Sequence, residues 1–281
     1  MDKVKIKNAL KQKMESLSLS GNKSAKLIGI SSANVSNVLN EKWDVVGDAI
    51  LRKVEMFCGL NTGWQAAKTA NLTKIYALAQ DAQYNKVALA FSFSPGAGKS
   101  FALQHYKNNV QNVGYVECDE YWTKKILVKK IAASFGITVE GSLHEMIESL
   151  VSAISLILEP LIIIDEADKL SDSNLNIFKT LFNRLLDKCG FILCGAPFFK
   201  LRIEKGVAKN KQAYQEIYSR LGGEFIPLQT VSATDIGVVC KANGITDTSR
   251  IQVIIRDAKS DLRQVARIIH KIKKQQQNGN S

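Results

Sequence analysis

The sequence contains no apolar run approaching the roughly 20 residues that a membrane-spanning helix needs. Its basic opening, residues 1–5, is not followed by the apolar core of a signal peptide, so we expect a cytoplasmic protein. Cysteine is also scarce: there are five, an odd number, and none forms a C-x-x-C pair. This usage argues against a disulfide framework and against a zinc site.

The composition otherwise describes a soluble globular protein, with 46% hydrophobic and 23% charged residues. A chain of 281 residues can bury a sizeable core and hold more than one domain. Acidic residues are few: 26 against 38 lysines and arginines, which leaves a net charge of +12. This excess favours a polyanionic partner, although a basic protein without such a partner has the same composition.

Residues 24–40 resemble the helix-turn-helix of phage repressors. Ala25 is small where two helices must approach closely, and Gly29 supplies the turn between them. Either Ser31 or Ser32 caps the second helix. A helix over residues 8–19 precedes this motif, and one or two helices over residues 44–60 follow it. We therefore predict a small all-α domain over residues 1–60.

In this motif the second helix enters the major groove of DNA, and its first turns meet the base edges. The exposed candidates for base contact are Ser32, Asn34, Ser36 and Asn37, and Lys26 is placed to touch a phosphate. None is an arginine that could read guanine bidentately, so we expect largely nonspecific binding to double-stranded DNA. The alternative is a helical domain used for protein contacts.

A glycine-rich stretch, FSPGAGKS at residues 93–100, lies between an apolar run and a predicted helix. Strand, glycine-rich turn, Lys-Ser and helix, in that order, are typical of a phosphate-binding loop. Lys99 would reach the β- and γ-phosphates of ATP, and the Ser100 hydroxyl would bind Mg²⁺. Phe93 replaces the first glycine of the usual pattern, at a position that still belongs to the strand. The predicted ATP contacts are Ser94, Pro95, Gly96, Ala97, Gly98, Lys99, Ser100 and Phe101.

A second motif follows four apolar residues, 161–164, that predict a strand buried on both faces of a parallel sheet. Asp165, at the end of this strand, would hold Mg²⁺ together with Ser100, and Glu166 would be the base that activates water. Asp168 would stabilise the turn. Read alone, the carboxylates could be an acidic turn after a core strand. Together with the glycine-rich loop they predict an ATP-hydrolysing site.

The loop and the Asp-Glu pair together resemble the AAA+ family of P-loop ATPases over residues 84–275. The resemblance implies an α/β fold: a P-loop AAA+ core with a parallel sheet and a helical lid, here preceded by the helix-turn-helix domain. It implies a sensor near residues 194–196, where neither Asn nor Thr stands. It also implies that Arg263 contacts the nucleotide from the lid. Arg220 would be an arginine finger reaching a neighbouring subunit, or else a surface salt-bridge residue.

The rest of the chain completes this plan. We expect a connecting helix over residues 61–83, the ATPase core over 84–227 with a final strand at 224–228, a three-helix lid over 228–275 and a disordered tail over 276–281. Cations crowd a predicted loop around Gly206, where Lys205, Lys209 and Lys211 would contact DNA phosphates. The alternative for that run is a solvated surface.

The domain order resembles the B proteins of Mu-type transposition systems. The resemblance implies an ATPase that oligomerises or forms filaments on target DNA, recruits and stimulates a transposase, and leaves the DNA when ATP is hydrolysed. Two alternatives stay open: a replication initiator or helicase loader, and a transcriptional repressor that only senses ATP.

Overall fold

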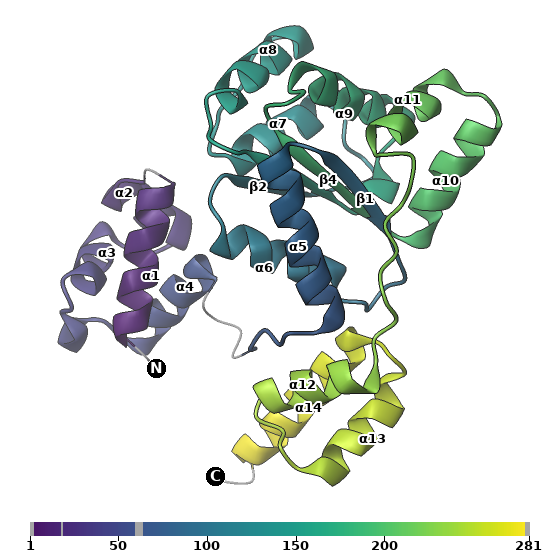
Figure 1. Cartoon of the computed structure of the whole chain (residues 1–281). Helices are drawn as coiled ribbons and strands as arrows, with labels where there is room; N and C mark the ends of the chain where they lie inside the picture. The colour runs from purple at the N-terminus through teal and green to yellow at the C-terminus, as the bar shows by residue number, and fades with distance from the viewer. Residues whose placement is uncertain (1–2, 18, 60–63, 279–281) are drawn as a thin grey trace. The chain divides into compact units, whose positions relative to one another are not determined.

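The structure, a computed structural model, describes residues 3–17, 19–59 and 64–278 (Figure 1). Contacts divide the chain into two compact units, residues 1–65 and residues 66–281, which we call the head and the body. The boundary predicted at residues 61–63 lies outside the described residues. Over the described ranges, no helix combines the length and the apolarity needed to span a bilayer.

The described part of the head is helical. It consists of α1 (Lys3–Ser16), α2 (Gly21–Ile28), α3 (Ser32–Leu39), the short 3-10 helix η1 (Trp43–Val45) and α4 (Asp48–Cys58). These helices share one apolar core, in which Leu10, Val38 and Leu51 are fully buried. Burial of that face stabilises helices that are each too short to be stable alone.

The turn between α2 and α3 is fixed by local hydrogen bonds. Gly29 ends α2 with φ +72°, a left-handed conformation that glycine adopts without steric cost. The Ser31 hydroxyl then accepts a hydrogen bond from the Asn34 N–H and caps α3. Of the two serines that the sequence offered as caps, Ser31 fills the role.

The body is built on a four-stranded parallel sheet in the order β1-β4-β3-β2. Its strands are β1 (Ala88–Ser92), β2 (Val113–Glu117), β3 (Leu161–Asp165) and β4 (Gly190–Gly195). Every residue of β3 and β4 is buried. Because the strands are parallel, their carboxyl ends lie along one edge of the sheet, where ligands bind in open α/β folds.

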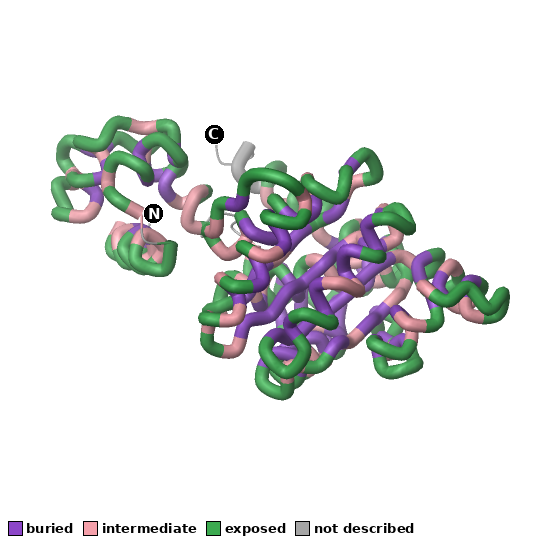
Figure 2. The backbone as a smooth tube through the Cα atoms, turned by 90° about the horizontal axis from the view of Figure 1, so that it is seen from above, coloured by how far each residue is buried: buried purple, intermediate pink, exposed green. Residues whose placement is uncertain are grey.

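Helices cover both faces of the sheet. Ile162 and Ile164 of β3 pack in one apolar cluster with α7 (Lys124–Ser134), α8 (Leu143–Ile154) and α9 (Asp172–Arg184). Leu161 and Ile163 pack in a second cluster with α5 (Ala70–Asn85) and α6 (Lys99–Asn109). This alternation follows from the period of two along a strand. The buried residues accordingly run along the strands in Figure 2. The predicted α/β core with a parallel sheet is confirmed.

The remaining elements of the body are helices. Those of the core are α5 (Ala70–Asn85), α6 (Lys99–Asn109), α7 (Lys124–Ser134), α8 (Leu143–Ile154), η2 (Ala167–Lys169), α9 (Asp172–Arg184), α10 (Pro197–Ala208) and α11 (Gln212–Arg220). Three more form the lid: α12 (Ala233–Ala242), α13 (Thr248–Ala258) and α14 (Leu262–Asn278). The backbone of α14 thus continues into the stretch predicted as a disordered tail, and residues 279–281 lie outside the described residues.

The structure corrects three further sequence predictions. Residues 224–228 form no strand: the Ile226 N–H donates to the Ala90 carbonyl at 2.8 Å, but Pro227 has no N–H with which to continue a ladder. The spacing of Ser142 and Glu145 predicts a capping box that opens a helix reaching residue 159; the capping box is present, but the helix ends at Ile154. The basic loop around Gly206 is wrong as well, because Gly206 lies inside α10.

Candidate functional site

The glycine-rich loop joins β1 to α6 at the carboxyl edge of the sheet. The Phe93 N–H still donates to the Gly195 carbonyl, so Phe93 extends the pairing of β1 with β4. Gly96 and Gly98 follow with φ +82° and +85°, and α6 begins at Lys99. Two left-handed residues at the start of a helix make a concave backbone of the kind that receives an anion.

Lys99 lies within the curve of this loop. Its ammonium donates to the carbonyl of Phe93 at 2.6 Å and to that of Ser94 at 2.9 Å. Burial lowers the pKa of Lys99, and the nearby carboxylates of Asp165 and Asp168 oppose this effect. The two sequence motifs therefore lie within electrostatic reach of each other, as the topology of the sheet requires.

Asp165 ends β3 with its side chain buried, at 1% relative exposure. One carboxylate oxygen accepts a hydrogen bond from the Glu166 N–H at 2.9 Å, and the other accepts one from the Tyr115 hydroxyl at 2.8 Å. A buried carboxylate and the hydroxyl of Ser100 are oxygen ligands of the kind that Mg²⁺ prefers, so these residues fit that ion.

Glu166 has a left-handed backbone, with φ +54°, which costs about 1 kcal/mol or more for a residue other than glycine. Its carboxylate forms an ion pair with Lys169 Nζ at 2.5 Å. The hydrogen bond to Glu166 raises the pKa of Lys169. Glu166, the predicted base, is therefore ion-paired with a lysine three residues later in the same loop.

Asp168 makes a structural contact with the segment that follows β4. Its carboxylate accepts a hydrogen bond from the Ala196 N–H at 2.9 Å, just after β4. This contact is close enough that a Cβ at Gly195 would come within 2.8 Å of the same oxygen. The predicted sensor position thus consists of buried Cys194, Gly195 and a backbone N–H that already has a partner.

The start of α14 lies directly on the loop. The Leu262 N–H donates to the Gly96 carbonyl at 2.9 Å. The Asp261 carboxylate fills the space beside the Gly96 α-carbon, because a Cβ there would come within 2.2 Å of Asp261 Oδ1. Arg263 is exposed, yet its charge contributes to lowering the pKa of Lys99. Arg263 therefore reaches the loop electrostatically, and Asp261 stands two residues before it in the sequence.

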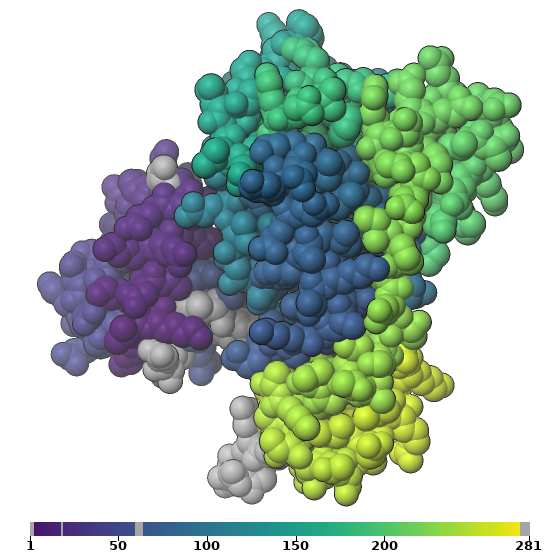
Figure 3. All heavy atoms as spheres, in the orientation of Figure 1, coloured from purple at the N-terminus to yellow at the C-terminus, as the bar shows by residue number. Residues whose placement is uncertain are grey.

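Asn71, near the start of α5, ties the loop to the segment that leads into the lid. Its side-chain nitrogen donates to the Ala97 carbonyl at 3.1 Å and to the Gln229 carbonyl at 2.7 Å, while its oxygen accepts from the Gln229 N–H at 2.9 Å. Asp235 of α12 accepts from the neighbouring Ala70 N–H at 2.8 Å. Figure 3 shows the connecting segment running alongside α5 toward the lid.

Arg220 ends α11 and is exposed. Its guanidinium lies 5.8 Å from the centre of the Phe182 ring, a cation–π arrangement. Phe101 is partly exposed and lies beside His105 of the same helix, with 6.0 Å between the ring centres. Of the predicted nucleotide contacts, residues 94–101 and Arg263 are thus brought together within the body, whereas Arg220 contacts an aromatic side chain.

The cations predicted to touch DNA in the body lie at the junction of two helices. Lys205 is in the last turn of α10, Lys209 ends that helix and Lys211 precedes α11. Gly206 is buried there because the ring of Tyr214 packs against its α-carbon; a Cβ would come within 2.3 Å of the ring. The sequence suggested a loop because it does not show this close helix contact.

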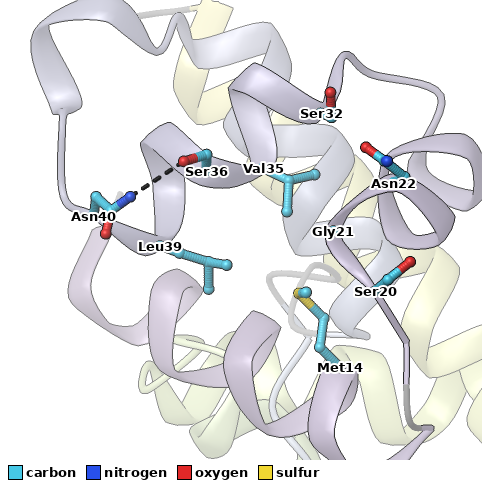
Figure 4. Close-up of a pocket in the computed structure, with 9 residues that line it drawn as sticks. All are labelled: Met14, Ser20, Gly21, Asn22, Ser32, Val35, Ser36, Leu39 and Asn40. Atoms are coloured by element: carbon cyan, nitrogen blue, oxygen red, sulfur yellow. Dashed lines mark hydrogen bonds between the residues drawn. The ribbon is translucent and has the colours of Figure 1, made fainter.

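The head has an open pocket of about 390 Å³ beside α3, lined by Met14, Ser20, Gly21, Asn22, Ser32, Val35, Ser36, Leu39 and Asn40 (Figure 4). Ser32 and Ser36 are exposed, but Asn34 and Asn37 are partly buried. Asn40 donates to the Ser36 hydroxyl at 3.2 Å. The exposed face of α3 therefore includes Asn40, which the sequence analysis did not select, and Lys26 is exposed on α2.

Residues 93–203 match the family model of the AAA domain. The matched range runs from the phosphate-binding loop through β3 and β4 into α10, so it includes both halves of the site. No curated protein matches the sequence.

Similarity to one solved structure supports this fold. The Orc1 protein of Aeropyrum pernix, solved in complex with DNA, has a TM-score of 0.50 and 16% sequence identity, and the match covers 70% of this chain and 56% of that one. A DNA replication initiation factor matches with TM-score 0.49 and 17% identity, over 72% and 61% of the two chains. RuvB of Thermotoga maritima matches with TM-score 0.45 and 12% identity, over 76% and 65%. This chain thus spans little more than half of the Orc1 chain.

Four residues of the site were not predicted from the sequence: Asn71, Tyr115, Asp261 and Leu262. Asp261 and Leu262 stand next to Arg263, so the lid motif did point to their neighbourhood. Nothing in the sequence distinguishes Asn71 or Tyr115, because each acts through a contact between residues far apart in the chain.

Proposed function

We propose that the protein is an ATP-dependent DNA-binding protein of DNA transposition, which oligomerises on target DNA and recruits a transposase. The observation that carries the ATPase part is the convergence of the AAA domain's glycine-rich loop and its Asp165–Glu166 pair at one edge of the sheet. The lid contacts that same loop through Leu262. A nucleotide bound there would thus touch both the core and the lid.

Phosphate binding uses groups that are already in place. The Lys99 ammonium exchanges the carbonyls of Phe93 and Ser94 for phosphate oxygens, which carry a full negative charge and so bind the cation more strongly. Mg²⁺, held by Ser100 and Asp165, would neutralise phosphate charge when bound. The lowered pKa of Lys99 reflects its burial, and an added phosphate favours its charged form.

Hydrolysis requires Glu166 to accept a proton from an attacking water. In the structure its carboxylate is paired with Lys169 instead of facing a water. The catalytic step therefore includes separation of the Glu166–Lys169 pair. The left-handed backbone of Glu166 holds its carboxylate on the loop that follows β3.

The lid responds to the nucleotide through two neighbouring residues of opposite charge. An incoming phosphate is repelled by the Asp261 carboxylate beside Gly96 and attracted by Arg263. Only a contact that differs between two lid positions can shift their populations, and this pair provides such a difference. A lid position set by ATP would then control whether subunits stay assembled, with Arg220 reaching a neighbour's site.

DNA binding follows from the cations and from the head. Phosphate contacts come from three lysines of the body, Lys205, Lys209 and Lys211. In the head, α2 and α3 form a pair in which α3 fits the major groove, as in a helix-turn-helix. The Orc1 structure with a similar fold is itself a DNA complex. Weak base readout by short polar side chains predicts nonspecific, salt-sensitive binding, which suits selection of target DNA rather than recognition of one operator.

The test is electron microscopy of the protein with random-sequence duplex DNA, in ATP and in ADP, alongside measurement of phosphate release. We expect assemblies on DNA with ATP and none with ADP or with Lys99→Ala. Sequence-restricted dimers that ignore the nucleotide would show the repressor alternative instead.

A replication initiator would use the same ATPase site, and the Orc1-like fold is compatible with it. Two further measurements separate the functions: addition of the purified transposase of the same mobile element, and addition of the host's replicative helicase. ATP-dependent stimulation of strand transfer supports the transposition role, whereas ATP-dependent helicase loading supports the initiator role.

A further inference from the structure

Tyr115 joins the two elements that carry the candidate Mg²⁺ ligands. It lies on β2, and its hydroxyl donates to Asp165 Oδ2 of β3 at 2.8 Å. The same hydroxyl accepts a hydrogen bond from Gln104 Nε2 of α6 at 3.2 Å. Gln104 stands one helical turn after Ser100, so it lies on the same side of α6. Two side-chain hydrogen bonds, which we call the relay, thus connect α6, the helix of Ser100, to the carboxylate of Asp165.

The relay leaves Asp165 able to bind a cation. The Glu166 N–H occupies one lone pair of Oδ1, Tyr115 occupies one of Oδ2, and the Cys194 thiol is a further hydrogen-bond partner of this carboxylate. An ionised carboxylate offers about four acceptor positions, so at least one stays open. Two donors on different oxygens also fix the rotation of the carboxylate plane. The remaining lone pairs therefore point in set directions.

The Tyr115 hydroxyl can keep this role at any physiological pH. A phenol ionises only near pH 10, so its hydroxyl stays protonated and donates. The ring is only partly buried and packs with the apolar cluster under α5 and α6. Phenylalanine would fill the same space, so replacing the tyrosine removes its hydrogen bonds and little else.

We propose that Tyr115 is a positioning residue for Mg²⁺: it orients the Asp165 carboxylate and, through Gln104, sets its place relative to the helix that carries Ser100. This inference rests on the proposed ATPase function. Groups that orient metal ligands in this way typically contribute 10- to 100-fold in metal affinity or activity, which is the scale of effect to expect.

The experiment compares wild type with Tyr115→Phe in the full-length protein. Binding of a fluorescent ATP analogue is measured in EDTA and then over a Mg²⁺ titration, followed by kcat and KM for ATP at low and saturating Mg²⁺. Tyr106→Phe is the matched control, because it removes a tyrosine hydroxyl on α6 that bonds Gln83 rather than Asp165. Gln104→Ala removes the outer half of the relay, and circular dichroism confirms that each variant is folded.

We expect Tyr115→Phe to leave binding in EDTA within about 2-fold of wild type, and to raise the half-saturating Mg²⁺ concentration by about 10-fold or more. Saturating Mg²⁺ should restore most of kcat. Gln104→Ala should shift the Mg²⁺ dependence in the same direction by less, and Tyr106→Phe should not shift it.

An unchanged Mg²⁺ dependence in Tyr115→Phe would overturn the inference. So would an equal loss of binding with and without Mg²⁺, since that result would show a structural role only. If wild type itself binds no ATP, the proposed function fails and the inference fails with it. That outcome is distinct, because it is seen before any variant is made.

Discussion

Removal of the Asn71 side chain is the sharpest test of how the phosphate-binding loop is held. Asn71 is buried, and its amide makes three hydrogen bonds, one to the Ala97 carbonyl and two to the backbone of Gln229. Alanine would leave those backbone groups without their partner. We therefore expect Asn71→Ala to destabilise the body and to weaken nucleotide binding together.

The magnitude follows from the number of bonds. At a net contribution of about 1 kcal/mol for each hydrogen bond, the three bonds of Asn71 contribute about 3 kcal/mol. For a unit of this size, 1 kcal/mol shifts the melting temperature by about 2–4 °C, so a decrease of about 6–12 °C is expected. Asn71→Asp should be at least as severe at neutral pH, because a carboxylate oxygen would then face two carbonyl oxygens.

The assay is urea unfolding followed by the fluorescence of Trp122, which is buried in the core of the body. Replacing Trp43 and Trp64 by phenylalanine makes Trp122 the only tryptophan. Asn85→Ala is the control, because this residue of the same helix bonds only at the surface, to Asp81. A loss below about 1 kcal/mol for Asn71→Ala, with an unchanged urea slope, would refute the reasoning.

Three other predictions concern catalysis and pH. Glu166→Gln should keep ATP binding but slow hydrolysis by about 10²- to 10⁴-fold, and DNA-bound assemblies should persist; rapid disassembly would contradict its role as the base. Arg220→Ala should lower hydrolysis only under conditions of assembly, seen as turnover that no longer rises with protein concentration; an equal loss in dilute protein would rule out a finger acting between subunits. Hydrogen bonds from Tyr214 and from the Arg202 guanidinium lower the pKa of Asp172. The ionised Asp172 carboxylate therefore stabilises the fold above about pH 4, and this contribution is lost as pH falls through the lower pKa of the folded state. The difference in unfolding free energy between wild type and Asp172→Asn should therefore shrink below pH 4, and a constant difference from pH 6 to pH 2 would contradict this.

The sequence was sufficient to predict what depends on neighbours in the chain. The apolar run of β3, the glycines of the loop and the serine caps of α3 and α8 each act through local geometry, and the structure places them as their patterns indicate. The order of strand, loop and helix also placed Lys99 at the edge where Asp165 ends its strand, because parallel strands share that edge.

What the sequence did not predict depends on contacts between distant segments. The segment containing Pro227 reads as a strand from its apolar residues, but the missing N–H decides its structure at the edge of the sheet. The glycine at position 206 reads as a loop residue, yet it is glycine because an aromatic ring of α11 packs against it. Tyr115 and Asn71 carry no recognisable pattern, since their partners come from other elements.

The contact of α14 with the phosphate-binding loop has a mechanical consequence. The helix has 17 residues and is about 25 Å long, and it is anchored near its first residue by the Leu262–Gly96 hydrogen bond. A rotation of about 10° at this anchor, modest for a domain movement, would displace the far end by about 4 Å. Lys271 and Lys274 lie toward that end and are exposed. A small rotation at the phosphate-binding loop would thus become a movement of whole side chains at the far end of the helix.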